Sequence, residues 1–293
     1  MRSILALGLF DLLAKLPLRT LHFLGAALGW LMFHFSASYA NRLRENLRLA
    51  FPDLSAAEFQ QLLSANIKEA GKAIAELPWV WRRPLPEVVK VAREIHGWKQ
   101  VENASAKGQG VIILLPHLGC FEVVGSLLSS RKATTCLYRV PKLAWLDAVM
   151  RAGRDRGLMK SAKADVSGVR ILFKGLKKGE INGILPDQVP GNGEGEWATF
   201  FGRPAYTMTL APRLIEASGA AVFMCYAERL PQGAGYNIYF SELKITDFSD
   251  LPQKINHALE DIIRRCPAQY LWSYNRYKTP RGVTPFAANK ETV

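Results

Sequence analysis

The sequence predicts an α/β protein in which helices flank a mixed β-sheet, with a hydrophobic helical segment ahead of the sheet domain. Two observations support this prediction. From residue 111 onward, short apolar runs alternate with stretches of helical periodicity. Before that, residues 3–35 are almost entirely apolar. The chain has 293 residues, of which 49% are hydrophobic, so it can bury a sizeable core.

The elements follow from local patterns. Residues 41–80 are expected to be helical, with Ser55 and Glu58 as a capping box. A short strand at 88–95 and a helix at 98–106 come next. Further strands are expected at 111–115, 135–138, 181–185, 221–227 and 236–240. Further helices are expected at 119–130, 142–156, 167–178, 207–218 and 252–266.

The N-terminal segment favours contact with a membrane. Residues 1–40 are therefore assigned to a hydrophobic, membrane-anchoring segment and 41–293 to the α/β domain. A signal peptide fits less well, because Asp11, Lys15 and Arg19 interrupt the apolar run, and a buried core helix stays open as an alternative. Arginines follow directly at 42, 44 and 48, where positive charge favours the cytoplasmic side.

The charge predicts an anionic partner. The formal net charge is +13, and residues 131–178 hold thirteen Lys and Arg against three Asp. A solvated basic face is the plain alternative. Nucleic acid is disfavoured, because this stretch has few aromatic residues and no known binding motif. The four cysteines form no CxxC pair and indicate free thiols, and the five scattered histidines predict no metal site.

A histidine and a carboxylate end the apolar run "VIILLPHLGCFEVVGSLL" (111–128). Pro116 closes the strand, so His117 should lie at its carboxyl end, where α/β proteins bind ligands. Glu122 can meet His117 only if the histidine precedes the helix and the glutamate lies in its first turns. A carboxylate so placed would orient the imidazole as a general base. Cys120, between them, is an alternative nucleophile, although a small packed residue fits it better.

The stretch "LLPHLGCFE" resembles the H-x4-D/E motif of glycerolipid-type acyltransferases. It is more closely similar to the bacterial lipid A biosynthesis (late) acyltransferases, of the lauroyl and myristoyl transferase type. The likeness extends over nearly the whole chain. It includes "LYRVPKLAWLDAVMRAGRDRG" (137–157), "LKKGEINGILPDQVPG" (176–191), "ATFFGRPAYTMTLAPRLIEASGAAV" (198–222) and "PAQYLWSYNRYK" (267–278).

The resemblance implies a glycerolipid-acyltransferase-like fold and a reaction. A fatty acyl chain would pass from an acyl carrier protein thioester to a hydroxyl of a lipid A precursor, with no cofactor and no metal. His117 would be the general base and Glu122 its support. Arg154 and Asp187 match the family's further functional residues and are expected to bind substrate or to support the site. Arg139 and Lys142 from the basic stretch are further candidates for substrate binding. The expected location is the cytoplasmic face of a bacterial inner membrane, in contact with its lipids.

Other functions stay open. Coenzyme A is a possible donor, since it too is polyanionic. The acceptor could be another lipid, such as a lysophospholipid or an ornithine lipid. The chain could also be a non-catalytic basic membrane protein that binds anionic lipid, or a thiol hydrolase that uses Cys120.

Overall fold

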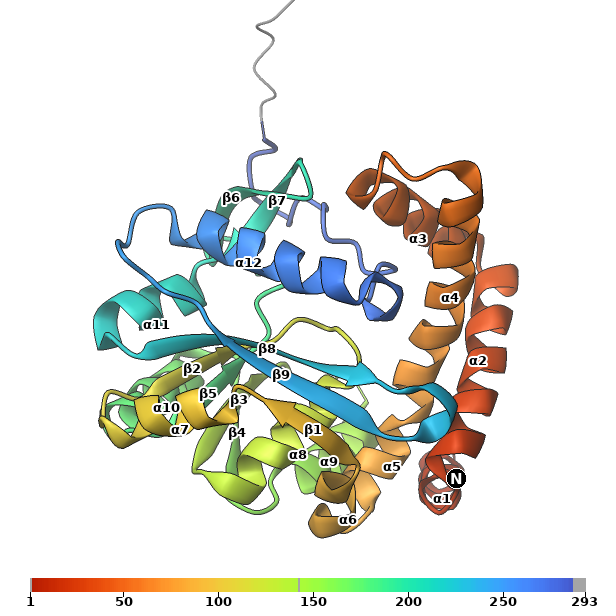
Figure 1. Ribbon diagram of the computed structural model, residues 1–293, viewed down its shortest axis with the longest axis horizontal. Coiled ribbons are helices and arrows are strands. Elements are labelled where there is room, and N and C mark those ends of the chain that lie inside the picture. Colours follow the sequence, from red (N-terminus) through yellow and green to blue (C-terminus); the bar gives the residue numbers. More distant parts are fainter. Residues whose placement is uncertain (1, 142, 287–293) are drawn as a thin grey trace, which may run out of the picture.

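A seven-stranded sheet in the order β1-β9-β8-β2-β5-β3-β4 lies at the centre of the computed structural model, which describes residues 2–141 and 143–286 (Figure 1). The five strands from β8 to β4 are parallel, β9 is antiparallel to β8, and β1 runs parallel to β9. The sheet strands are β1 (Ala92–His96), β2 (Val111–Leu114), β3 (Thr134–Tyr138), β4 (Met159–Lys163), β5 (Ile181–Ile184), β8 (Ala221–Arg229) and β9 (Tyr236–Glu242). A separate antiparallel hairpin joins β6 (Gly195–Phe200) to β7 (Arg203–Met208).

Helices cover both faces of this sheet. The first four are α1 (Arg2–Ala14), α2 (Leu18–Phe35), α3 (Ala37–Ala50) and α4 (Ala56–Ala75), and of these α2, α3 and α4 stand along one side (Figure 1). The others are α5 (Leu77–Arg82), α6 (Leu85–Lys90), α7 (Trp98–Ala106), α8 (Phe121–Arg131), α9 (Ala144–Arg154), α10 (Val166–Lys177), α11 (Leu210–Ser218) and α12 (Leu251–Arg265). Two short 3-10 turns are η1 (Pro231–Gly233) and η2 (Pro267–Gln269).

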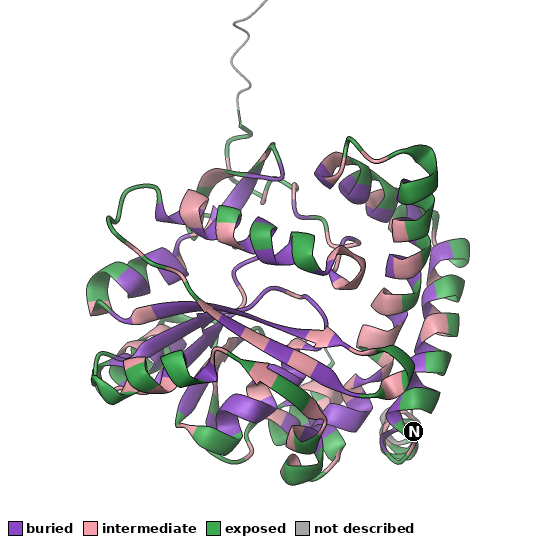
Figure 2. Ribbon diagram, viewed as in Figure 1, coloured by how far each residue is buried: buried purple, intermediate pink, exposed green. Residues whose placement is uncertain are grey.

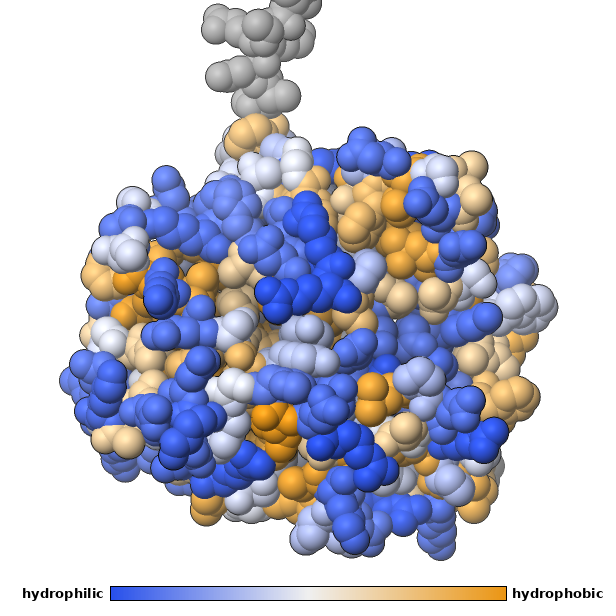
Figure 3. Space-filling view, viewed as in Figure 1, coloured by the Kyte–Doolittle hydropathy of each residue, from blue (hydrophilic) through white to orange (hydrophobic). Residues whose placement is uncertain are grey.

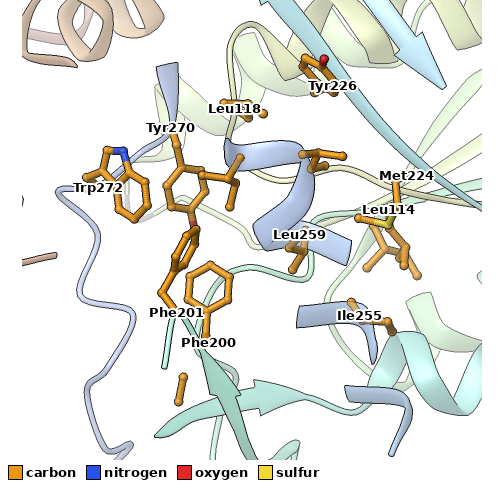
Figure 4. Close-up of a cluster of buried hydrophobic side chains, with 14 of the residues drawn as sticks. Leu114, Leu118, Phe200, Phe201, Met224, Tyr226, Ile255, Leu259, Tyr270 and Trp272 are labelled. Carbon is orange, nitrogen blue, oxygen red and sulfur yellow. The ribbon is translucent and has the colours of Figure 1, made fainter. Parts of the chain in front are cut away.

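Strand β2 divides two hydrophobic cores. Ile112 and Leu114 point into the core that α10, α11 and α12 cover, whereas Val111 and Ile113 point into the core beneath α7, α8 and α9. All four side chains are fully buried, as expected for a central parallel strand (Figure 2). Figure 4 shows the first core, where aromatic side chains of the β6–β7 hairpin meet those that follow α12. Hydrophilic residues cover most of the outer face in this view (Figure 3).

The strand–helix alternation predicted from residue 111 is confirmed, with five strands and their helices displaced by only a few residues. Three strands were not predicted, namely β4, β6 and β7. The strand expected at 88–95 was misplaced. A helical turn, α6, occupies Leu85–Lys90, because prolines at its start favour helix initiation, and β1 follows it. The helix expected at 207–218 begins only at Leu210, after β7.

The apolar N-terminal run forms two helices, α1 and α2, which break at Pro17. Within residues 2–141 and 143–286, no helix has both the length and the apolarity to cross a bilayer. The expectation of a membrane-anchoring helix is therefore not supported in the sense of a spanning segment. Helix α1 packs against α5, and α2 packs along α4. The division of the chain at residue 40 stays a prediction.

Glycines let α2 and α4 pack at close range. A Cβ atom added to Gly29 would lie 2.0 Å from the backbone oxygen of Ile67, and one added to Gly71 would lie 1.9 Å from that of Gly25. The helix backbones are therefore in direct contact, which no larger residue would permit. This packing brings His22 of α2 into the interior, where only 4% of its surface is exposed.

We expect Gly29→Ala to destabilise the protein by about 2 kcal/mol or more, because the added methyl group forces the two backbones apart. Gly8→Ala is the matched control. A Cβ atom there meets nothing within 4 Å, so the substitution should be neutral or stabilising by about 0.5–1 kcal/mol. Urea unfolding of both variants measures the difference. Equal stability of Gly29→Ala and the wild type would contradict the close packing.

Candidate functional site

Two paired strands bring His117 and Asp187 together. Leu114 of β2 is the register partner of Ile184 of β5, and each strand continues as Leu-Pro before its ionisable residue. His117 and Asp187 thus lie at the same offset from a register pair, at the carboxyl edge of the parallel strands. Ligands bind at this edge in open α/β sheets. The position predicted for His117 is confirmed.

Asp187 binds His117 through both carboxylate oxygens. Its Oδ1 lies 2.8 Å from Nδ1 of the imidazole, and its Oδ2 accepts the His117 backbone N–H at 2.9 Å. Burial would raise the pKa of Asp187, but the interactions with His117 outweigh it and hold that pKa below its ordinary value. The carboxylate is therefore ionised. In the neutral form of the imidazole, the proton lies on Nδ1, where this carboxylate accepts it, and Nε2 has the lone pair.

Glu122 does not face His117, contrary to the expectation. Its carboxylate binds Arg154 of α9, whose Nε lies 3.1 and 3.2 Å from the two oxygens and whose Nη2 also donates to Oε1. The sequence argument failed because β5 brings a different carboxylate to the imidazole. Burial would lower the pKa of Arg154, but the charge of Glu122 raises it above its usual range. The result is a buried ion pair beside the histidine.

Of the other two predicted substrate-binding residues, Arg139 and Lys142, the structure describes only the first, and it makes no hydrogen bond to this pair. Arg139 is exposed at the end of β3, and Lys142 lies outside the described residues. Within 2–141 and 143–286, no group of His, Cys, Asp and Glu has the arrangement of a metal site. Cys120 is only 2% exposed, and burial raises the pKa of its thiol well above the ordinary value. A buried thiol of this kind is a poor nucleophile.

A rigid loop carries the histidine. Gly119 has a φ of +60°, and a Cβ atom there would lie 1.8 Å from the carbonyl oxygen of Ala227. The Gly119 N–H donates to Gln269 and the Cys120 N–H to Ala227, while the His117 carbonyl accepts from Leu271. The loop is thereby bound to β8 on one side and to the C-terminal segment on the other.

A buried cluster of charged side chains, centred on Arg229, is hydrogen-bonded to this loop. Arg229, at the end of β8, donates to Glu76 at 2.9 and 2.5 Å, to Glu69 at 2.7 Å and to the Gly119 carbonyl at 3.2 Å. The Glu76 carboxylate also accepts from Tyr236 at 2.7 Å and lies 3.3 Å from Nε2 of His22. The cluster connects α2, α4, β8 and β9 to the backbone two residues after His117.

A mostly apolar cavity opens beside the ion pair. The space in it that the centre of a water-sized sphere can reach is about 40 Å³, so the cavity is narrow in this structure. Glu122, Arg154 and Phe121 line it, and the Phe121 ring also packs edge-on against the His117 ring with 4.9 Å between centroids. The remaining walls include Trp81, Leu115, Gly125, Leu128, Met159, Gly183 and Leu185. His117 itself does not line the cavity, and Phe121 connects the two.

The fold and this site are those of an α/β enzyme that carries a carboxylate-oriented histidine beside an apolar cavity. The model of the bacterial lipid A biosynthesis acyltransferase family matches residues 2–279, so the chain belongs to this family and is an acyltransferase. It is 29% identical to the lipid A biosynthesis palmitoleoyltransferase of Escherichia coli, over 93% of this chain and 90% of that one. The lauroyltransferase of the same organism is 26% identical, over 95% and 92% of the two chains. Its myristoyltransferase is 23% identical, over 89% and 82%.

Two features of the site were not predicted. Asp187 was expected to bind substrate or support the site, but not specifically to contact His117, and Gln188, whose amide lies 3.2 Å from Nε2 of His117, was not considered. The repeated ends "LPH" (115–117) and "LPD" (185–187) of two predicted strands are the signal that could have paired the first two residues.

We expect Glu76→Gln to lower the free energy of unfolding by on the order of 3 kcal/mol at neutral pH. Burial raises the pKa of Glu76, but Arg229 and His22 more than offset it and lower that pKa from 4.5 to about 2. A carboxyl whose folded pKa is depressed stabilises above its unfolded pKa and loses this effect as the pH falls. The gap between wild type and variant should therefore close from pH 4.5 toward 2.

Urea unfolding at a series of pH values measures this gap. Glu216→Gln, at an exposed position of α11, is the control and should leave the stability unchanged. A Glu76→Gln deficit that stays constant on acidification would show that the ionised carboxylate is not what stabilises the fold.

Proposed function

We propose that this protein transfers a fatty acyl chain from a carrier thioester to a hydroxyl of a lipid A precursor, with His117 as general base. The observation that carries the proposal is the hydrogen bond from Nδ1 of His117 to Asp187, which makes Nε2 the ring nitrogen that can accept a proton. Membership of the lipid A family supports the acceptor. The names of the similar proteins specify different acyl chains, so they do not choose one for this chain.

The reaction needs one base and no covalent enzyme intermediate. The acceptor hydroxyl gives its proton to Nε2 of His117 while its oxygen attacks the thioester carbonyl carbon. The ionised Asp187 stabilises the imidazolium that forms. When the tetrahedral intermediate collapses, the carbon–sulfur bond breaks, and the leaving thiolate takes the proton back from the imidazolium. The ester product and a free thiol result, and the histidine is neutral again.

The Glu122–Arg154 pair has a different role in this proposal. It lines the cavity next to Phe121, so it contributes to the wall where the acyl chain meets the reacting carbonyl. The carboxylate holds the guanidinium in one orientation through three hydrogen bonds. An arginine so held is preorganised to contact a polar substrate group at the mouth of the cavity.

Exposed basic residues suit an acidic carrier protein as the donor. Arg139 follows β3 and Lys163 ends β4, at the same sheet edge as His117. With strands about 4.8 Å apart, β4 lies roughly 14 Å from β2. Helix α10 begins near this edge and runs toward the opposite one, and it carries three more exposed basic residues, Arg170, Lys174 and Lys177. The surface there is hydrophilic (Figure 3). A carrier docked there by charge would present its thioester toward the site, and coenzyme A is the alternative polyanionic donor.

Exposed apolar side chains on α1 and α2 suit an acceptor that comes from a bilayer. They are large and lie on the outer sides of two neighbouring helices, at Leu5, Leu9, Leu12, Phe23, Trp30, Leu31 and Phe35. Phe35 is 83% exposed and Phe23 is 74% exposed, which is unusual for residues of this size. We propose that these helices lie in the interface of the inner membrane at its cytoplasmic face, rather than across the bilayer.

Acyl transfer in detergent tests the proposal. Purified protein, an acyl carrier protein thioester and a lipid A precursor should give a product heavier by one acyl chain in mass spectrometry. His117→Ala should lower the rate by about 10²–10⁴, the usual contribution of a general base. The wild-type rate should also fall on acidification, since the base must be neutral.

Cys120→Ser is the matched control and should keep the activity, because the thiol is buried and protonated. Loss of transfer in Cys120→Ser with retention in His117→Ala would favour a thiol mechanism. Transfer to a lysophospholipid but not to the lipid A precursor would establish the other lipid acceptor instead. Unchanged activity in His117→Ala would exclude the proposed base.

Glycines in the cavity wall predict a limit on acyl-chain length. A Cβ atom on Gly125 would lie 3.6 Å from Cε of Met159, and one on Gly183 would lie 3.9 Å from Sγ of Cys136. Both are ordinary contacts, so Gly125→Ala and Gly183→Ala should fold normally while filling part of the cavity. If the acyl chain occupies this space, the ratio of longer to shorter products should fall about fourfold, as expected for one displaced methylene group.

Competition between acyl donors of increasing chain length, with product ratios read by mass spectrometry, measures this effect. Gly8→Ala, on the outer helix α1, serves as the control and should leave the ratios unchanged. Product ratios that do not move in either cavity variant would place the acyl chain elsewhere.

A further inference from the structure

Gln188 contacts the nitrogen that the proposed reaction uses as its base. Its side-chain Nε2 lies 3.2 Å from Nε2 of His117. Because Asp187 accepts the proton on Nδ1, the other ring nitrogen presents a lone pair, and the amide N–H is the donor of this contact. In the free protein, the lone pair of the base is therefore already occupied by a protein group.

The backbone of Gln188 is held on both sides. Asp187 before it binds His117 through both oxygens, and the N–H of Val189 after it donates to the Tyr274 hydroxyl at 2.9 Å. The side chain of Gln188 is half-buried, and it can turn about its own χ bonds without any movement of this backbone. It ends beside the nitrogen that would react.

We infer that Gln188 is a further catalytic residue, whose amide occupies the place of the acceptor hydroxyl in the free enzyme and donates to the thioester oxyanion during transfer. The inference rests on the proposed function. A hydroxyl that gives its proton to Nε2 must lie about 2.6–3.2 Å from it, which is where the amide nitrogen now lies. The incoming hydroxyl therefore displaces the amide.

The displaced amide remains next to the reaction. The hydroxyl oxygen bonds to the thioester carbon, and the oxyanion is attached to that same carbon. An amide that moves by about one hydrogen-bond length stays within reach of the oxyanion, and it has two N–H donors to offer. Loss of one oxyanion donor costs about 10²–10³ in kcat.

Other charged groups around this contact stay in place when Gln188 is changed. Asp187 binds the opposite side of the imidazole, and burial together with the Asp187 charge raises the pKa of Tyr270 well above its ordinary value. The remaining groups nearby are Tyr274, Tyr277 and Arg276 of the C-terminal segment and the Glu122–Arg154 pair on α8 and α9. A change in pH dependence on substitution of Gln188 would thus report its own contact with Nε2.

The test uses the transfer assay with Gln188→Ala and Gln188→Glu. Gln188→Ala should lower kcat by about 10²–10³ with the KM of donor and acceptor within about threefold of wild type. Gln188→Glu places a carboxylate beside Nε2, which stabilises the imidazolium, so the acidic limb of its pH–rate profile should move to higher pH. Gln61→Ala, at an exposed position on α4, is the control and should match the wild type in both measurements.

Three results would overturn the inference. They are a Gln188→Ala kcat within about threefold of wild type, a rise in KM with unchanged kcat, and a Gln188→Glu profile that stays in place. A merely structural role would lower the thermal stability of both variants without moving the profile. The proposed function fails separately: an active His117→Ala, or a wild type without transfer, removes the base itself, whereas an active wild type with an unaffected Gln188→Ala removes only this residue.

Discussion

The ion pair between Arg229 and Glu76 connects helices α2 and α4 and strands β8 and β9 to the loop that carries His117. Both side chains are 1% exposed, and each makes further hydrogen bonds, so the desolvation of the two charges is offset by a fully occupied shell of partners. A buried pair of this kind is weak as a source of net stability, since apolar residues could replace it. Its value lies in specificity, because a buried charge accepts only one arrangement of the groups around it. Here that arrangement includes the Gly119 carbonyl, two residues from the histidine.

The second constraint is the register between β2 and β5. Parallel strands pair with regularly spaced hydrogen bonds, so residues at equal offsets beyond a register pair emerge at the same height. The pairing continues one residue further, since the Leu115 N–H donates to the Ile184 carbonyl. A proline follows each of the two strands, Pro116 after β2 and Pro186 after β5, and ends the hydrogen-bonded ladder. His117 and Asp187 are thus positioned by backbone geometry before their side chains interact, and the bidentate contact completes the arrangement.

Much of this architecture could be predicted from the sequence, for reasons that particular residues illustrate. The run at 111–115 was recognisable because a strand buried on both faces is continuously apolar. The β6–β7 hairpin was not recognisable, because its two-residue turn has positive φ at both Phe201 and Gly202, and phenylalanine is not a residue that signals such a turn. Strand β4 lies at the sheet edge, and the lysines in its sequence "MKSAK" hide its pairing with β3.

The candidate site, too, could be predicted from the sequence only in part. Local spacing placed His117 correctly, because a strand, a proline and a glycine determine where that residue emerges. It could not assign the partner of His117, because Asp187 lies 70 residues away and reaches the ring only through the strand order. Glu122 was close in sequence but had a stronger partner in Arg154, and only the packing of α9 against the sheet domain brings that guanidinium near.

The site holds two carboxylates, and each has its own partner: Asp187 is hydrogen-bonded to His117, and Glu122 forms an ion pair with Arg154. An isolated charge beside an apolar cavity would be costly, so each charged group there needs a partner. Asp187 meets this demand through two hydrogen bonds from His117, and Glu122 and Arg154 compensate each other. Phe121 packs on the imidazole and lines the cavity, so it separates the two pairs while joining them to the same apolar space. In the proposed reaction, positive charge would develop on the imidazole when Nε2, which now contacts the neutral amide of Gln188, takes the proton of the acceptor hydroxyl.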